Sequence, residues 1–128
     1  MRLIDADELK KKLEAEHCDC EIMALIDDIP TAAEATNAKA AAIMAHYGAE
    51  PQKDILIEEC AELIQAVEKS RRQPDAPELT ADMVEEMADV YIMIMQFESI
   101  MGPYWSGVFD RTVEDKLVRQ MDRIREEG

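Results

Sequence analysis

Long stretches without helix-breaking residues constrain the fold of this chain more than any other feature. Neither Gly nor Pro occurs in residues 52–73, 78–101 or 108–127. Apolar side chains recur there every three or four residues, the period of an amphipathic helix. Ala and Met are frequent and aromatic residues make up only 5% of the 128 residues, which favours helices over strands. We therefore predict an all-α protein, long enough for one domain with its own core.

Caps and breakers place the helices along the chain. Asp5 with Glu8, and Thr31 with Glu34, have the spacing of capping boxes that open the first helix and an Ala-rich helix. Further segments are predicted at about residues 21–28, 51–72, 80–101 and from 110 or 112 almost to the C-terminus, with Gly102-Pro103 ending the third of these. We divide the chain into a small N-terminal helical extension and a main helical domain, residues 1–30 and 31–128.

The charge balance excludes several classes of partner. The chain has 14 basic and 29 acidic residues, a net charge of −15, whereas nucleic acids and anionic membranes attract positively charged surfaces. The most apolar stretch is interrupted by polar residues and is shorter than the roughly 20 residues that a bilayer requires. No signal-peptide pattern opens the sequence, and the three cysteines follow no disulfide spacing. We expect a cytoplasmic protein that binds neither nucleic acid nor membrane.

Two acidic clusters on the central helices are the candidate functional residues. Glu59 and Glu62 lie one turn apart on one helix, as do Glu86 and Asp89 on the next. Residues 78–101 contain six acidic residues and no Lys or Arg, whereas a solvated face usually alternates the two signs. The acidic side of this helix becomes apolar one turn later, so we expect the carboxylates to be partly buried and to need a partner.

Two carboxylate pairs brought together by antiparallel helices would form an oxygen-rich metal site. Such a site suits Mg²⁺ or Mn²⁺. Zinc and di-iron fit less well, because neither central helix contributes a His. Solvated acidic surface remains the alternative interpretation of either cluster alone.

The spacing of these acids resembles a known family. Glu59-x-x-Glu62, followed after 23 residues by Glu86-x-x-Asp89-Val90, is similar to the MazG-like all-α nucleoside triphosphate pyrophosphohydrolases, over roughly residues 31–128. The resemblance implies a helical bundle completed by a homo-oligomer, dimer or tetramer, with Mg²⁺ held by the four carboxylates. It also implies cleavage of a nucleoside or deoxynucleoside triphosphate between the α- and β-phosphates, which yields the monophosphate and pyrophosphate.

Further roles follow from this resemblance. Glu58 or Glu85 is a candidate to position or deprotonate the attacking water. Lys116 and Arg123 on the last helix are candidates to bind the phosphates, and surface ion pairs with neighbouring acids are their alternative. Independently of the resemblance, Trp105 follows the helix-breaking Gly102-Pro103 and is a candidate to stack on the base, although a residue in that position more often anchors a loop against the bundle.

The packing of Gln96 and the function of the chain each allow more than one interpretation. Gln96 lies in a Met-rich run that is apolar nearly all round, which predicts either a core position or a subunit interface that could supply its polar partner. A non-catalytic acidic module that binds a protein or a divalent ion is one alternative function. A phosphoribosyl-nucleotide pyrophosphohydrolase is another, and it would differ only in the base pocket.

Overall fold

The computed structural model describes residues 6–15 and 32–128, and all regular elements in these ranges are helices. They are α1 (Ala6–Ala15), α3 (Ala32–Tyr47), α4 (Ala49–Arg72), α5 (Pro77–Glu98) and α6 (Gly102–Glu127). The all-α prediction is confirmed. The caps Asp5 and Thr31 and the segment expected at residues 21–28 lie outside the described residues. The division of the chain near residue 30 therefore stays a prediction.

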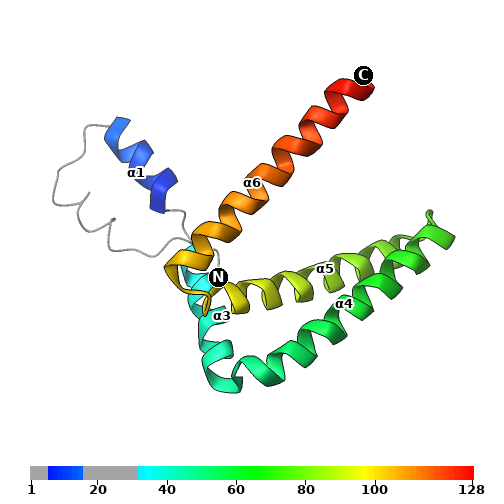
Figure 1. Cartoon of the computed structure of the whole chain (residues 1–128), viewed down its shortest axis with the longest axis horizontal. Helices are drawn as coiled ribbons and strands as arrows, with labels where there is room; N and C mark the ends of the chain where they lie inside the picture. The colour runs from blue at the N-terminus through cyan, green and yellow to red at the C-terminus, as the bar shows by residue number, and fades with distance from the viewer. Residues whose placement is uncertain (1–5, 16–31) are drawn as a thin grey trace.

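The hairpin of α4 and α5 forms the centre of the fold. The two helices run antiparallel and are joined by a short turn, while α3 lies across the open end of the hairpin (Figure 1). The α4–α5 contact is the most extensive between helices, and α3 packs mainly on α5. The buried apolar residues come from all three helices: Ala40, Met44, Ala66, Met93 and Met95. Small alanines let the helix backbones approach, and the flexible methionines fill the remaining space.

Gly48 makes the corner between α3 and α4. Its φ of 84° lies in the left-handed region that glycine adopts without steric cost. Its N–H donates to the carbonyl of Met44 at 2.8 Å and so closes the last turn of α3.

Two helices begin earlier than the sequence signals predict, and proline is the reason in both cases. α5 begins at Pro77, not at Thr80. α6 begins at Gly102, where a start near residue 110 or 112 was predicted, so Gly102-Pro103 opens this helix and does not simply end the one before it. Proline has no N–H to donate and its φ is already helical, so it is accommodated in a first turn.

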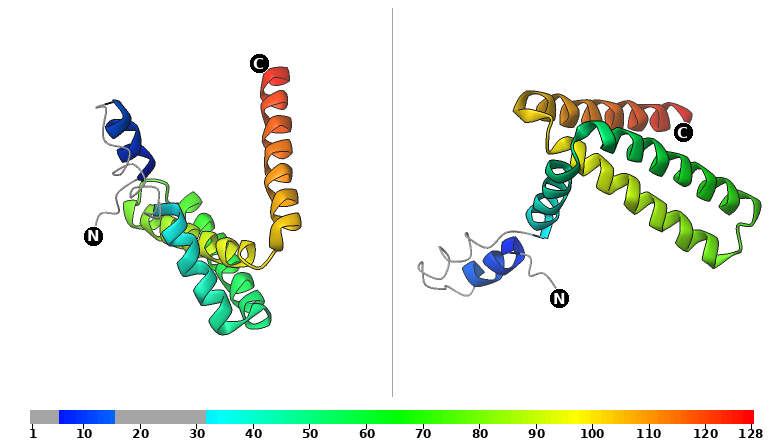
Figure 2. Two further views of the ribbon diagram at one scale, coloured as in Figure 1. Left: turned by 90° about the vertical axis from the view of Figure 1, so that its left-hand side faces the viewer. Right: turned by 90° about the horizontal axis from the view of Figure 1, so that it is seen from below.

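Helix α6 diverges from the hairpin and extends away from it (Figures 1 and 2). None of its residues is buried. Four apolar side chains at helical spacing are between 41% and 60% exposed: Val113, Leu117, Met121 and Ile124. We call these four residues the α6 stripe. Across the described part of the chain, no helix combines the length and the apolar character needed to span a bilayer.

Candidate metal centre

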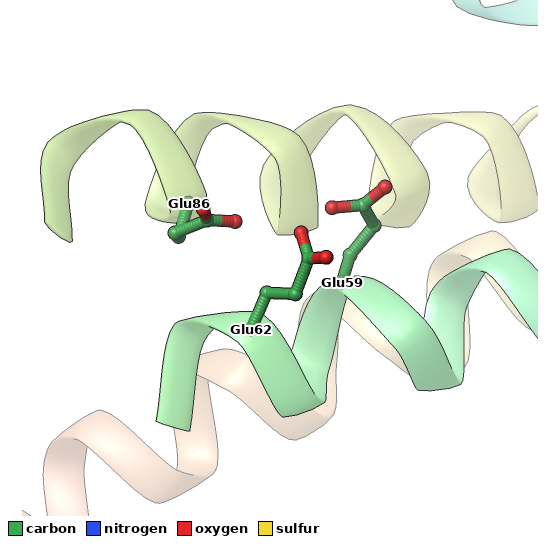
Figure 3. Close-up of side chains that lie close together, drawn as sticks. All are labelled: Glu59, Glu62 and Glu86. Carbon is green, nitrogen blue, oxygen red and sulfur yellow. The ribbon is translucent and has the colours of Figure 1, made fainter. Parts of the chain in front are cut away.

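Three carboxylates converge between α4 and α5. One oxygen from each of Glu59, Glu62 and Glu86 lies within 4.8 Å of the other two. Glu59 and Glu62 project from α4 toward α5, and Glu86 reaches the same space from α5 (Figure 3). The spacing of three residues places the two α4 carboxylates on one side of the helix, and the antiparallel hairpin brings Glu86 opposite to them.

The environment of Glu86 is unfavourable to a bare carboxylate. Its Oε2 is buried, and no hydrogen-bond donor among the described residues reaches it. Partial burial raises the pKa of the Glu86 carboxyl above its ordinary value, and the negative charges of Glu62, Asp89, Glu59 and Glu85 raise it further. A cation bound between the helices would remove both penalties.

Glu59 has the same kind of environment on α4. Burial is the main cause that raises the pKa of its carboxyl, followed by the charges of Asp89, Glu62 and Glu58. On α5, Glu86 and Asp89 are partly buried, as predicted, but Asp82 is exposed because it lies a turn nearer the solvated end of the hairpin. On α4, Glu59 is partly buried and Glu62 is exposed. Asp89 lies outside the convergent trio but is close enough to act electrostatically on both Glu59 and Glu86.

The donor set fits a hard divalent cation. The converging atoms are all carboxylate oxygens, which Mg²⁺ and Mn²⁺ accept as ligands. No Lys or Arg in the described ranges forms an ion pair with any of the four acids. Lys69 of α4 lines a hollow together with Asp82, Glu85 and Glu86, without forming an ion pair with any of the four acids.

The two candidate catalytic acids lie beside this cluster. Glu58 and Glu85 are both exposed. They are close enough to raise the pKa of Glu59 and of Glu86 respectively, but neither belongs to the convergent trio. Their role in handling water therefore stays a prediction.

The candidate substrate-binding residues of α6 lie apart from the acids within one chain. Lys116 and Arg123 line a shallow hollow on α6 itself. Trp105 is 60% exposed and lines a separate apolar hollow on the same helix. Asp122 pairs with Arg125 at 3.0 Å. Within the described residues Lys116 and Arg123 form no ion pair, so the surface pairs considered as their alternative are not present.

A cavity beside the acids was not predicted from the sequence. It measures about 500 Å³ and is bordered by Glu59 and Asp89 at one end. At the other end Gln52 Nε2 donates to Gln96 Oε1 at 2.6 Å, and both side chains are buried. Gln96 thus finds its polar partner within the chain, where a partner across a subunit interface was considered. A lone glutamine in an otherwise apolar run was the only signal of this pair.

Comparison with protein families identifies the domain that contains these acids. The model of the MazG nucleotide pyrophosphohydrolase domain matches residues 49–123, which is more than half of the chain. The chain belongs to the MazG family. The matched region begins with α4 and extends into α6, so it contains all four candidate metal ligands. No curated protein and no solved structure matches the chain.

Proposed function

We propose that this MazG domain is a Mg²⁺-dependent pyrophosphohydrolase that converts a nucleoside or deoxynucleoside triphosphate to the monophosphate and pyrophosphate. The convergence of Glu59, Glu62 and Glu86 beside Asp89 is the observation that carries the proposal. These four carboxylates are the groups that would hold the metal, and the family match supports hydrolysis of a nucleotide anhydride.

A divalent cation bound there would neutralise phosphate charge and acidify a water molecule. The chain itself must position that water and accept its proton. Glu58 and Glu85 are exposed beside the cluster, so one of them can take this proton. The oxygen of the water forms the new bond to the α-phosphorus, the bond to the α–β bridging oxygen breaks, and pyrophosphate leaves.

The products of hydrolysis test this proposal. We expect monophosphate and pyrophosphate from at least one NTP or dNTP in a panel that also includes a phosphoribosyl nucleotide, and EDTA should abolish the reaction. Turnover of the phosphoribosyl nucleotide alone would favour the alternative pyrophosphohydrolase. In H₂¹⁸O the label should enter the monophosphate, because attack at the α-phosphorus leaves the new oxygen there. Diphosphate with orthophosphate would contradict the proposed cleavage. Metal binding by a folded protein without turnover would favour the non-catalytic module.

We also propose that the protein is a homo-oligomer in which α6 of one copy packs on a second copy. The α6 stripe is uncovered, and α5 exposes Val84, Met87 and Tyr91 by 53% to 63%. Residues 110–127 carry five bases against six acids, whereas the whole chain has a net charge of −15. Another copy of this acidic chain is therefore repelled less along α6 than along α5, which carries six acids and no base. Such packing would also bring Lys116 and Arg123 toward the acids of the partner.

Leu117→Glu tests this assembly, because it places a charge in the middle of the α6 stripe. We expect the wild type to have at least twice the monomer mass by light scattering and the variant to have the monomer mass. The matched control is Arg111→Gln, which makes the same change in net charge on another side of α6. It should keep the wild-type mass. A monomeric wild type, or an unchanged mass in the variant, would overturn the proposal.

A further inference from the structure

We propose that the cavity between α3, α4 and α5 holds the base of the nucleotide, with Gln52 and Gln96 reading its edge and Tyr47 covering its face. This inference rests on the proposed function, because it names the part of the substrate that determines specificity. The ligand class is a planar heteroaromatic base that carries an N–H donor next to an acceptor.

The cavity has the size and the walls that a small planar ligand requires. Its volume of about 500 Å³ lies within the roughly 300–1,000 Å³ typical of small-molecule sites. Ile55, Ile92 and Met93 provide apolar walls. Tyr47, at the end of α3, lies at the rim and is 60% exposed. Its ring meets the His46 ring edge to face, with centroids 4.6 Å apart, and stays largely exposed. An exposed aromatic ring beside apolar walls suits stacking on a base, which tolerates any base with a π face.

The glutamine pair provides the polar recognition. Gln52 is 6% exposed and Gln96 is 2% exposed. Gln52 Nε2 donates to Gln96 Oε1 at 2.6 Å, and Gln96 Nε2 donates to the sulfur of Met93 at 3.6 Å. These bonds hold the amides in one orientation and leave Gln52 Oε1 without a donor among the described residues. A free amide oxygen beside an amide N–H matches the adjacent donor and acceptor on the edge of a base.

The position of the pair relative to the acids gives the direction of the substrate. Gln52 and Glu59 are seven residues apart on α4, which corresponds to about 10 Å along the helix axis. Beyond the acids in the opposite direction, Lys69 lines the hollow that includes Glu86. A nucleotide lying along the α4–α5 groove would therefore have its base near α3, its α-phosphate at the acids and its outer phosphates toward Lys69.

Substitutions in the cavity test this assignment through the ranking of bases. We compare kcat/KM across the nucleotide panel for wild type, Gln52→Met, Tyr47→Ala and Tyr47→Phe. Gln52→Met should lower kcat/KM for the preferred base by about 10-fold or more and narrow the differences between bases, because one amide contact to a base edge is lost. Tyr47→Ala should raise KM by about 10-fold, and Tyr47→Phe should restore it, because stacking needs only the ring.

Matched controls separate recognition from folding and from metal binding. Gln65→Met makes the same change at an exposed position that does not line the cavity, and it should leave both the ranking and KM unchanged. Mn²⁺ affinity should be equal in all variants. Tyr47 is largely exposed, so Tyr47→Ala should fold. Its KM tests the inference even if Gln52→Met does not fold. A wild-type base ranking in Gln52→Met together with a wild-type KM in Tyr47→Ala would overturn the inference while the proposed function stands. If the wild type cleaves nothing, the proposed function fails, and the ranking of dissociation constants for α,β-imido nucleotides decides the inference.

Discussion

Glu86→Gln is expected to abolish turnover and, in the same protein, to raise the stability of the metal-free fold. The substitution removes one of three converging carboxylates, so turnover should fall by about 100-fold or more, the loss typical when one transition-state-stabilising group is removed. Without metal, the same carboxylate is buried at Oε2 beside other negative charges. The neutral amide relieves that repulsion and keeps the volume of the side chain.

Thermal unfolding in EDTA and in excess Mg²⁺ measures the second effect. The wild type should gain stability on adding Mg²⁺, because the ion binds only the folded site, and Glu86→Gln should lose most of that gain. The control is Glu78→Gln, which removes one charge from the first turn of the same helix. An acid there favours the helix dipole, so this control should be slightly less stable and fully active. A metal-free Glu86→Gln protein that melts well below wild type would contradict the interpretation that the Glu86 carboxylate destabilises the metal-free fold.

The helices were predictable because the apolar period and the breakers act locally. The long helix predicted at about residues 51–72 is α4 at Ala49–Arg72. The start of α6 was not predictable from the same signals, since proline stops one helix and opens another with equal ease. Which of the two happens depends on how the turn after the proline packs, and the dipeptide Gly102-Pro103 does not determine that packing.

The acids follow from local spacing along the helices, whereas the cavity depends on contacts between residues far apart in the sequence. Helical spacing alone places Glu59 and Glu62 on one side of α4, and a short connector then brings Glu86 opposite to them. The hydrogen bond between Gln52 and Gln96 joins residues 44 positions apart. Its existence depends on the register of α4 against α5, which the sequence pattern leaves free to shift by a turn. The acids were therefore found from the sequence, whereas the cavity required the structure.

The stability of the metal-free protein is expected to fall as the pH rises above the ordinary range of a carboxyl group. Burial raises the pKa of Glu59 and of Glu86 in the folded state, with neighbouring charges adding to the effect. A carboxyl that holds its proton more tightly when folded favours the fold fully below its unfolded pKa, near 4.5. That contribution disappears as the pH passes through the raised folded value. Mg²⁺ should oppose the loss, because it replaces the proton at the same oxygens.

Melting temperatures of wild type and of the double variant Glu59→Gln, Glu86→Gln, measured in EDTA between pH 4.5 and pH 8, isolate these two groups from the rest of the acidic chain. The advantage of the double variant should be small at pH 4.5 and should grow with pH, because its amides never ionise. Mg²⁺ should release protons on binding to the wild type, most strongly at the lower end of this range. An advantage that stays constant with pH would show that the two carboxyls titrate alike in the folded and unfolded states. It would also remove the electrostatic reason for placing a cation between α4 and α5.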